Sequence, residues 1–243
     1  MEGSIDAALI LAGGLGTRLR PITNIIPKPL VKVGKKPIIA HIIDELSRNE
    51  IHNVYVSVGY KAYKIINYLE NYKTPARMVF IREEMPLGTG GAVRLALRKI
   101  RGKNPNIFMT NGDDLFRLDI KKMFSFHAQN NADITLAAKE MGRRSVIESS
   151  GVVHFVKNRI DYFVEKPKLG EAPSRFINIG KYIIKTRIYR DLPRRSRFSF
   201  ERDFLQAHAR DLKIYAYPTH SAWYPADNIR RLETARRLWG YGR

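Results

Sequence analysis

The sequence predicts an α/β protein in which a mixed sheet is flanked by helices. Three observations lead to this fold class. Short apolar runs typical of buried strands alternate with segments whose apolar residues have helical spacing. Glycine-rich or polar segments directly follow two of the expected strands, where α/β sheets bind ligands. The second half contains consecutive strands, one pair of which forms a hairpin, so the sheet is not purely parallel.

The first half of the chain alternates strands and helices. Pro37 is placed to begin the first expected helix, because proline suits the first turn. Ile65, Ile66 and Leu69 share one face of the second helix. Alternation of this kind predicts parallel strands joined by right-handed crossovers. The expected strands are Ala7–Leu11, Val54–Val58, Met78–Ile81 and Asn106–Met109, and the expected helices are Ile38–Leu46, Ala62–Tyr72 and Ala92–Ile100.

The second half is less regular. Two of its strands are joined through Lys157-Asn158-Arg159, which predicts a hairpin. No internal repeat is visible, and in particular no hexapeptide period of a β-helix. We therefore expect one domain over residues 1–243. The expected strands are Ile134–Ala138, Gly151–Phe155, Ile160–Val164, Ile177–Ile184 and Leu212–Tyr217, and the expected helices are Phe200–Ala209 and Asn228–Leu238.

Charge is the most unusual bulk property, with a formal net charge of +20. Such charge suits either binding of nucleic acid or an enzyme with anionic substrates. The densest basic clusters, Arg94–Arg101, Arg194–Arg197 and Arg230–Arg237, suit two solvated helix faces and a loop. Neither a nucleic-acid motif nor an aromatic-rich binding segment accompanies them, so we expect no nucleic-acid partner.

Three further features concern the cellular setting. The chain contains no cysteine, which excludes disulfides and thiolate metal sites and suits a cytoplasmic protein. No apolar run is long enough to span a membrane, so we expect no membrane partner. The N-terminal residues lack a basic region before their apolar run, and we interpret that run as a strand and not as a signal peptide. The sequence leaves the oligomeric state open, a homo-oligomer included.

The segment Leu11–Pro21 contains three glycines directly after a strand, followed by Thr17 and Arg18. Glycines let backbone N–H groups approach a phosphate closely, and an arginine adds a bidentate contact. The spacing matches neither the dinucleotide fingerprint nor a Walker A loop. A plain strand-to-helix turn is the alternative, but glycine, threonine and arginine together favour phosphate binding.

Four other segments have residue types that suit phosphorylated ligands. Lys28 lies between two prolines, which stiffen the backbone that carries its amine. The glycines of Pro86–Ala92 would let a flat nucleobase lie against the backbone. Thr110–Asp114 offers carboxylates at a strand end for Mg²⁺. Glu165 could accept hydrogen bonds from hydroxyls while Lys166 holds a phosphate. An exposed turn, a packing loop, an Asx turn and a hairpin end are the respective alternatives.

In this order, the segments resemble the sugar-1-phosphate nucleotidyltransferase family, from Ala8 to about Arg237. The resemblance implies a three-layer α/β/α Rossmann-like fold, with a nucleotide-binding half at 1–120 and a sugar-phosphate-binding half at 121–243. It also implies catalytic roles for Arg18, Lys28, Asp113 and Lys166. The residues implied at the nucleotide are Leu11, Ala12, Gly13, Gly14, Gly16, Thr17, Arg18, Gly88, Thr89, Gly91 and Asp113, and those at the sugar phosphate are Asn111, Gly112, Glu165, Lys166, Asn178 and Gly180.

The metal site departs from the family pattern in one place. Many members end in Trp-x-Asp-x-Gly, whose aspartate binds the metal with the first aspartate, which corresponds to Asp113. Here Pro225 lies two residues after Trp223, and the nearest carboxylate is Asp227. We therefore expect Asp113 and Asp227 to hold Mg²⁺ or another divalent cation. Asp114 is a further candidate.

The resemblance implies that a nucleoside triphosphate and a sugar 1-phosphate form a nucleotide sugar and pyrophosphate. The Pro86–Ala92 loop and Ser199–Leu205 resemble guanylyl-transferring relatives that act on mannose or heptose 1-phosphate. The ending at Trp223–Asp227 and Gly59-Tyr60-Lys61 resemble cytidylyl-transferring relatives that act on glucose 1-phosphate. Thymidylyl or uridylyl transfer stays open, as does a catalytically inactive regulatory subunit. We favour guanylyl transfer.

Overall fold

The computed structural model describes residues 5, 7–100, 105–142, 144–168 and 170–239, and their contacts divide the chain into two compact units. Among the described residues, unit 1 contains Ile5 and those within Leu87–Met109 and Ile120–His220. Unit 2 contains Asp6–Pro86, Thr110–Asp119 and Ser221–Arg243. The units thus do not follow the two sequence halves, because the chain returns to unit 2 twice. A single domain over 1–243 stays a prediction.

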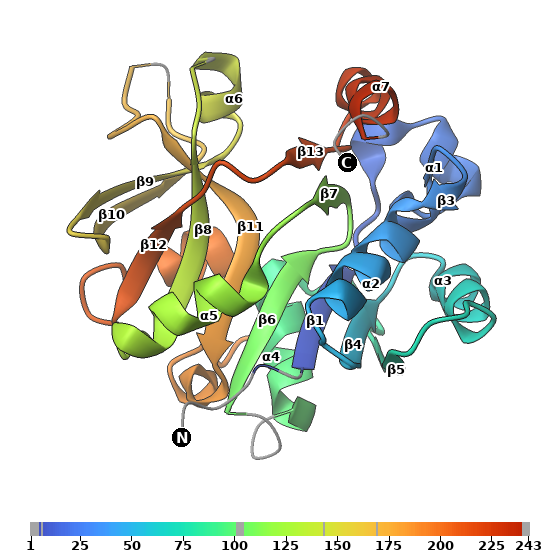
Figure 1. Cartoon of the computed structure of the whole chain (residues 1–243), viewed down its shortest axis with the longest axis horizontal. Coiled ribbons are helices and arrows are strands. Elements are labelled where there is room, and N and C mark those ends of the chain that lie inside the picture. Colours follow the sequence, from blue (N-terminus) through green and yellow to red (C-terminus); the bar gives the residue numbers. More distant parts are fainter. Residues whose placement is uncertain (1–4, 6, 101–104, 143, 169, 240–243) are drawn as a thin grey trace. The chain divides into compact units, whose positions relative to one another are not determined.

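Unit 2 contains a parallel sheet in the order β5-β4-β1, drawn side by side in Figure 1. Its strands are β1 (Ala7–Ala12), β4 (Asn53–Val58) and β5 (Arg77–Arg82). In β1 and β4, Ala7 pairs with Asn53 and Ala12 with Val58. The connections α2 (Ile38–Arg48) and α3 (Ala62–Glu70) are helical, which confirms the predicted strand–helix alternation. Parallel pairing brings the carboxyl ends of these strands to one edge.

Helix α2 forms because its apolar residues recur at helical spacing and are all buried, among them Ile39, Ile42, Ile43 and Leu46. Pro37 lies at its N-cap, so the predicted start is confirmed. The remaining elements of unit 2 are η1 (Thr17–Leu19), α1 (Ile22–Ile25), η2 (Lys28–Leu30), β2 (Lys32–Val33), β3 (Lys36–Pro37), β7 (Asp114–Phe116), β13 (Trp223–Pro225) and α7 (Ile229–Leu238).

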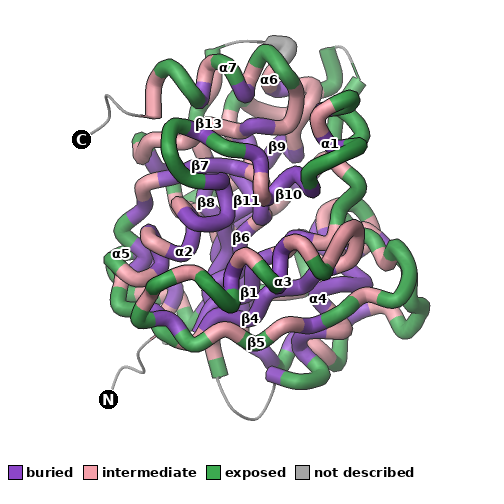
Figure 2. Tube along the Cα trace, turned by 90° about the vertical axis from the view of Figure 1, so that its right-hand side faces the viewer, coloured by how far each residue is buried: buried purple, intermediate pink, exposed green. Residues whose placement is uncertain are grey.

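Unit 1 contains a mixed sheet in the order β11-β8-β12-β10-β9. β8 pairs in parallel with β12 and antiparallel with β11, and β9 and β10 form the predicted hairpin. Figure 2 shows β8 and β11 as mainly buried. The strands are β8 (Ile134–Glu140), β9 (Gly151–Val156), β10 (Arg159–Glu165), β11 (Phe176–Lys185) and β12 (Ile214–Pro218), and the other elements are α4 (Gly88–Ile100), α5 (Ile120–Gln129), α6 (Arg144–Glu148), η3 (Thr186–Arg190) and η4 (Glu201–Leu205).

The helices show the main differences from the sequence prediction. The helix expected over Phe200–Ala209 is wrong as a regular α-helix, because only a π-helical turn, η4, forms before the chain turns. Helix α4 begins at Gly88, four residues earlier than predicted. Helix α5 was not predicted, although Ile120, Met123 and His127 recur at helical spacing and are buried. The strand β6 (Asn106–Asn111) crosses from unit 1 into unit 2.

No helix among the described residues is long and apolar enough to cross a membrane.

Candidate active site

The glycine loop of unit 2 follows β1 and turns at Gly16, whose φ of 63° lies in the left-handed region that favours glycine. Leu19 N donates to Gly16 O at 3.0 Å, and the Thr23 hydroxyl donates to the same carbonyl at 2.9 Å. A Cβ at Gly13 would collide with the Glu83 carboxylate. At Gly14 a Cβ would meet nothing within 4 Å. The loop is therefore packed at two glycines and open at the middle one.

Lys28 is a nearly buried cation beside this loop, its side chain 9 % exposed. It lies in η2 after Pro27, whose extended backbone positions it. Its Nζ donates to Oδ2 of Asp113. A Cβ at Gly16 would be 3.0 Å from the Lys28 Cβ, so the loop and the lysine are in direct contact. Paired charges are the usual condition for a lysine buried to this extent.

Asp113 follows the end of β6, and backbone bonds position it. Gly112 N donates to Leu11 O at 2.9 Å, which joins this segment to the end of β1. Ala226 N donates to Asp113 O at 3.3 Å. The Asp113 side chain is 34 % exposed, so a ligand can reach the carboxylate that Lys28 contacts.

Asp227 forms a second ion pair in the same unit. Its Oδ2 accepts from Nη1 of Arg18 at 2.6 Å, and Arg231 contacts it at 3.1 Å. The Arg18 side chain is 61 % exposed, whereas that of Asp227 is 13 % exposed. The structure thus brings together Arg18, Lys28, Asp113 and Asp227, residues far apart in the sequence.

Asp114 has a different environment from its neighbour. It is 4 % exposed, and its Oδ2 accepts from the Trp223 indole at 2.8 Å. Asp114 also pairs with Pro225 between β7 and β13. These contacts fix the buried Asp114 in the packing of unit 2, whereas the Asp113 side chain is partly exposed.

Unit 1 contains the predicted nucleobase loop, with Gly88, Thr89 and Gly91 at the start of α4. Gly88 has a φ of 70°. Gly90 N donates to Phe198 O at 3.0 Å, and Phe198 N donates to Leu87 O at 3.1 Å. Side chains at Gly90 and Gly91 would collide with residues 196–200. Close backbone packing therefore requires those two glycines, whether or not a base lies nearby.

The same unit contains Glu165 and Lys166 at the end of β10. Burial, and then the nearby Glu201, raise the pKa of Glu165, while Lys166 and Arg202 lower it. Lys166 Nζ lies 3.6 Å from Glu165 Oε1, and its side chain is 54 % exposed. An exposed lysine beside a largely buried carboxylate can hold a phosphate next to hydroxyl groups.

Asn178 and Gly180 lie at an irregularity of β11, where its register with β8 shifts between Asn178 and Tyr182. Gly180 has a φ of 69°, and its N–H donates to Asn178 Oδ1 at 3.0 Å. Asn178 Nδ2 donates to the Tyr182 hydroxyl at 2.6 Å. Sequence reasoning missed Tyr182, whose only signal was its position two residues after Gly180.

The predicted residues thus fall into two groups. The first, in unit 2, comprises Leu11, Ala12, Gly13, Gly14, Gly16, Thr17, Arg18, Lys28, Asn111, Gly112, Asp113 and Asp227. The second, in unit 1, comprises Gly88, Thr89, Gly91, Glu165, Lys166, Asn178 and Gly180.

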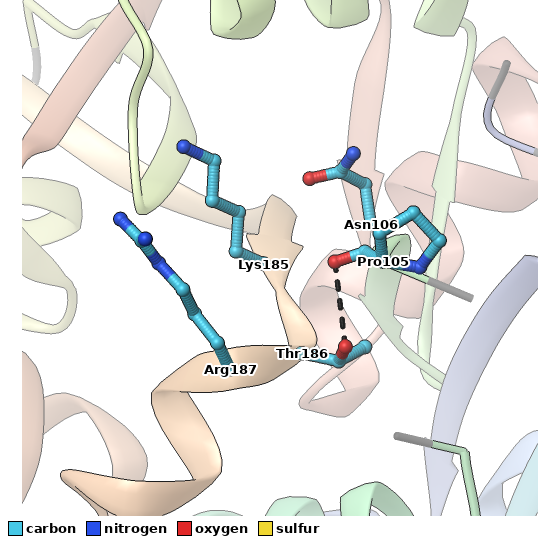
Figure 3. A pocket seen from close by; sticks show the side chains of 5 residues that line it. All are labelled: Pro105, Asn106, Lys185, Thr186 and Arg187. Carbon is cyan, nitrogen blue, oxygen red and sulfur yellow. Dashed lines mark hydrogen bonds between the residues drawn. The ribbon is translucent and has the colours of Figure 1, made fainter. Parts of the chain in front are cut away.

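A pocket of about 360 Å³ in unit 1 contains none of these residues. Figure 3 shows its lining, Pro105, Asn106, Lys185, Thr186 and Arg187. Lys185 Nζ donates to Asn131 Oδ1 at 2.5 Å, and Arg187 pairs with Asp133 at 2.5 Å. Both cationic side chains of this pocket, Lys185 and Arg187, already have protein partners, so we assign no ligand to the pocket.

Comparisons with known proteins identify the family. Residues 7–232 match the nucleotidyl transferase family, and the chain belongs to that family. It is therefore a nucleotidyltransferase with a mixed α/β fold, as the sequence predicted.

Two relatives are guanylyltransferases. The D-glycero-α-D-manno-heptose 1-phosphate guanylyltransferase of Aneurinibacillus thermoaerophilus is 37 % identical over 86 % of this chain and 88 % of its own length. The mannose-1-phosphate guanyltransferase of Saccharomyces cerevisiae is 32 % identical over 88 % of this chain, which spans 59 % of that protein. The crystal structure of HddC from Yersinia pseudotuberculosis with GMP-PN is similar with a TM-score of 0.81 and 28 % identity, over 97 % of this chain and 100 % of that one.

Proposed function

We propose that this protein joins a nucleoside triphosphate to a sugar 1-phosphate and releases pyrophosphate, with GTP and mannose or heptose 1-phosphate as the favoured pair. The observation that carries the proposal is the cluster of two ion pairs, Lys28 with Asp113 and Arg18 with Asp227, beside the open glycine loop. The guanylyltransferase relatives support the choice of base and sugar. Cytidylyl, thymidylyl and uridylyl transfer are the alternatives.

In the proposed reaction, an oxygen of the sugar phosphate forms a bond to the α-phosphorus of the triphosphate. The bond from that phosphorus to the oxygen bridging to the β-phosphate breaks, and pyrophosphate leaves with the electron pair. A phosphate monoester has its second pKa at about 6, so the nucleophile is mostly dianionic at neutral pH and requires no general base. The chain's contribution is to hold two polyanions together in line.

The side chains divide this work by their position. The N–H groups of the glycine loop and the exposed Arg18 bind the triphosphate, and the nearly buried Lys28 stabilises charge that develops on it. Lys166 binds the sugar phosphate. The Glu165 carboxylate accepts hydrogen bonds from sugar hydroxyls, and the Asn178 amide can donate to them or accept from them. The retained Arg18, Lys28 and Asp113 argue against an inactive regulatory subunit.

A divalent cation fits the chemistry of the two carboxylates in unit 2, Asp113 and Asp227. Carboxylate oxygens suit Mg²⁺, which takes one or two of them together with phosphate oxygens. Among the described residues, no group of three or more acidic or histidine side chains is arranged to hold a metal. Asp113 and Asp227 would hold the ion, which when bound supplies further neutralisation of phosphate charge.

A cytoplasmic location and self-association stay predictions.

The test is a screen for pyrophosphate release. GTP, ATP, CTP, UTP and dTTP are each combined with mannose, heptose and glucose 1-phosphates in the presence of Mg²⁺. We expect the largest kcat/KM with GTP and a mannose or heptose 1-phosphate. A larger value for another base would overturn the guanylyl assignment. Absence of release with every pair would overturn the proposed reaction.

A further inference from the structure

Glu201 is a half-buried carboxylate in unit 1 that accepts hydrogen bonds from three hydroxyl groups. Oε2 accepts from the Thr89 hydroxyl at 2.6 Å and from the Ser199 hydroxyl at 3.0 Å. Oε1 accepts from the Tyr182 hydroxyl at 3.4 Å. Thr89 and Tyr182 belong to α4 and β11, so one side chain joins three segments distant in the sequence.

On one side, Glu201 holds the loop at Gly88–Gly91. The Thr89 hydroxyl donates to Glu201 and accepts from Phe200 N at 2.9 Å, which defines its orientation. The backbone bonds between this loop and Phe198 hold the same segment. The loop that the sequence predicts to lie against the nucleobase is thus attached to the residues around Glu201.

On the other side, Glu201 holds the segment of β11 that the proposed function assigns to the sugar. The Tyr182 ring is 1 % exposed, and burial, with Glu201 next, raises the pKa of Tyr182 well above its ordinary value. The hydroxyl therefore stays protonated and donates to Glu201, while it accepts from Asn178 Nδ2. Asn178 in turn accepts from Gly180 N.

We propose that Glu201 is a positioning residue that connects the nucleobase loop to the sugar-binding segment of β11. It thereby fixes the positions of the two substrates relative to each other. This inference rests on the proposed function. Loss of the carboxylate would release Thr89 and Tyr182 together, and binding of both substrates would weaken although Glu201 contacts neither.

Besides its hydrogen bonds, the negative charge of Glu201 affects the pKa of Glu165. The charged groups near Glu165 are Glu201, Lys166 and Arg202, and Glu201 opposes its ionisation. Replacing Glu201 with glutamine removes a negative charge and lowers the pKa of Glu165. In the proposed function, Glu165 accepts hydrogen bonds from sugar hydroxyls as an ionised carboxylate. In the Glu201→Gln variant, the decrease of kcat/KM in acid should therefore begin at a lower pH than in wild type.

The experiment compares wild type with Glu201→Gln, Thr89→Val and the double variant, using pyrophosphate release to measure kcat and KM for each substrate. We expect Glu201→Gln to raise both KM values and to lower kcat/KM about tenfold or more, since hydrogen bonds to a charged group are lost. The double variant should lose less than the product of the single losses. Thr89→Ser, which retains the hydroxyl that donates to Glu201, should lose less activity than Thr89→Val.

The matched control is Glu140→Gln, an exposed glutamate of the same unit, for which both KM values and the pH profile should equal those of wild type. If Glu201→Gln does not fold, Tyr182→Phe and Thr89→Val provide the same test, and each should raise both KM values. Unchanged KM values in these variants of an active enzyme, or strictly multiplicative losses, would overturn the positioning role alone. A wild type without pyrophosphate release would instead overturn the proposed function on which it rests.

Discussion

At the scale of single residues, the cluster in unit 2 depends on the pairing of charges. Lys28 is nearly buried, so its charge would be unfavourable without Asp113. Arg18 is mostly exposed, and its pair with Asp227 contributes little to stability. The contrast in burial separates Lys28, a cation fixed in the packing, from Arg18, whose exposed side chain a ligand can reach.

We predict that Lys28→Ala and Asp113→Ala each lower kcat/KM by a factor on the order of 10²–10³, as for loss of one preorganised electrostatic contact. The measurement is pyrophosphate release, with circular dichroism to verify folding. Lys35→Ala, at an exposed lysine of the same unit, is the control and should retain full activity. Full turnover in a folded Lys28 or Asp113 variant would refute the assignment.

The adjacent aspartates Asp113 and Asp114 illustrate what residue identity leaves open. Both follow the same strand, so the sequence offered either as a metal ligand. The Trp223 indole and the β7–β13 pairing fix Asp114, whereas Asp113 is partly exposed and contacts Lys28. The distinction comes from a contact across more than a hundred positions of the chain.

At the scale of elements, α5 packs on the sheet of unit 1 through a buried histidine. His127 is 1 % exposed, and its Nδ1 contacts the Thr135 hydroxyl of β8 at 2.8 Å. Burial, and then the charge of Lys185, lower the pKa of His127 to about 4, against a partial opposing effect of Asp133. Protonation is therefore unfavourable in the folded state, and the helix packs with a neutral imidazole.

This shift predicts that the chain loses stability in mild acid. The folded pKa lies below the unfolded value of 6.5, so the unfolded state takes up a proton first as the pH falls. Between pH 7 and pH 5 we expect this group to lower the free energy of unfolding by about 2 kcal/mol. Urea denaturation of wild type and His127→Gln at both pH values measures the difference.

The variant should show a smaller decrease than wild type, whereas His52→Gln, at an exposed histidine, should follow wild type. Equal decreases in wild type and His127→Gln would contradict the assigned pKa.

At the scale of the whole molecule, the net charge of +20 concerns association more than folding. Both proposed substrates are polyanions, so a positive field increases their encounter rate. Salt screens this field, because the Debye length falls from roughly 30 Å at 0.01 M to roughly 10 Å at 0.1 M.

We predict that kcat/KM falls severalfold, up to about tenfold, as the KCl concentration rises from 10 to 300 mM. The value of kcat at saturating substrate should change much less, because bound substrates no longer depend on steering. Steady-state kinetics at fixed free Mg²⁺ measures both. A kcat/KM independent of salt would show that the charge serves another purpose.

Much of this protein was predictable from local pattern. The parallel strands β1, β4 and β5, the helices α2 and α3 and the β9–β10 hairpin follow from periodicity and turn residues, because each is determined by neighbours in sequence. The nucleotidyl transferase family was predictable from the glycine loop, the proline-flanked Lys28 and the segment at Asp113. Helix α5 was missed, although its buried residues do recur at helical spacing.

Tertiary structure decided what depends on distant contacts. It replaced the regular α-helix expected at Phe200–Ala209 with a π-helical turn at Glu201–Leu205, which periodicity in the sequence does not indicate. It divided the chain into units that differ from the sequence halves, since the chain re-enters unit 2 within β6, at Thr110, and again at Ser221. Residue types thus indicated which chemistry the chain can perform. Contacts across many positions selected Asp113 over Asp114 as the aspartate that meets Lys28, and they joined Thr89 and Tyr182 through Glu201, because burial and pairing arise only when the chain is folded.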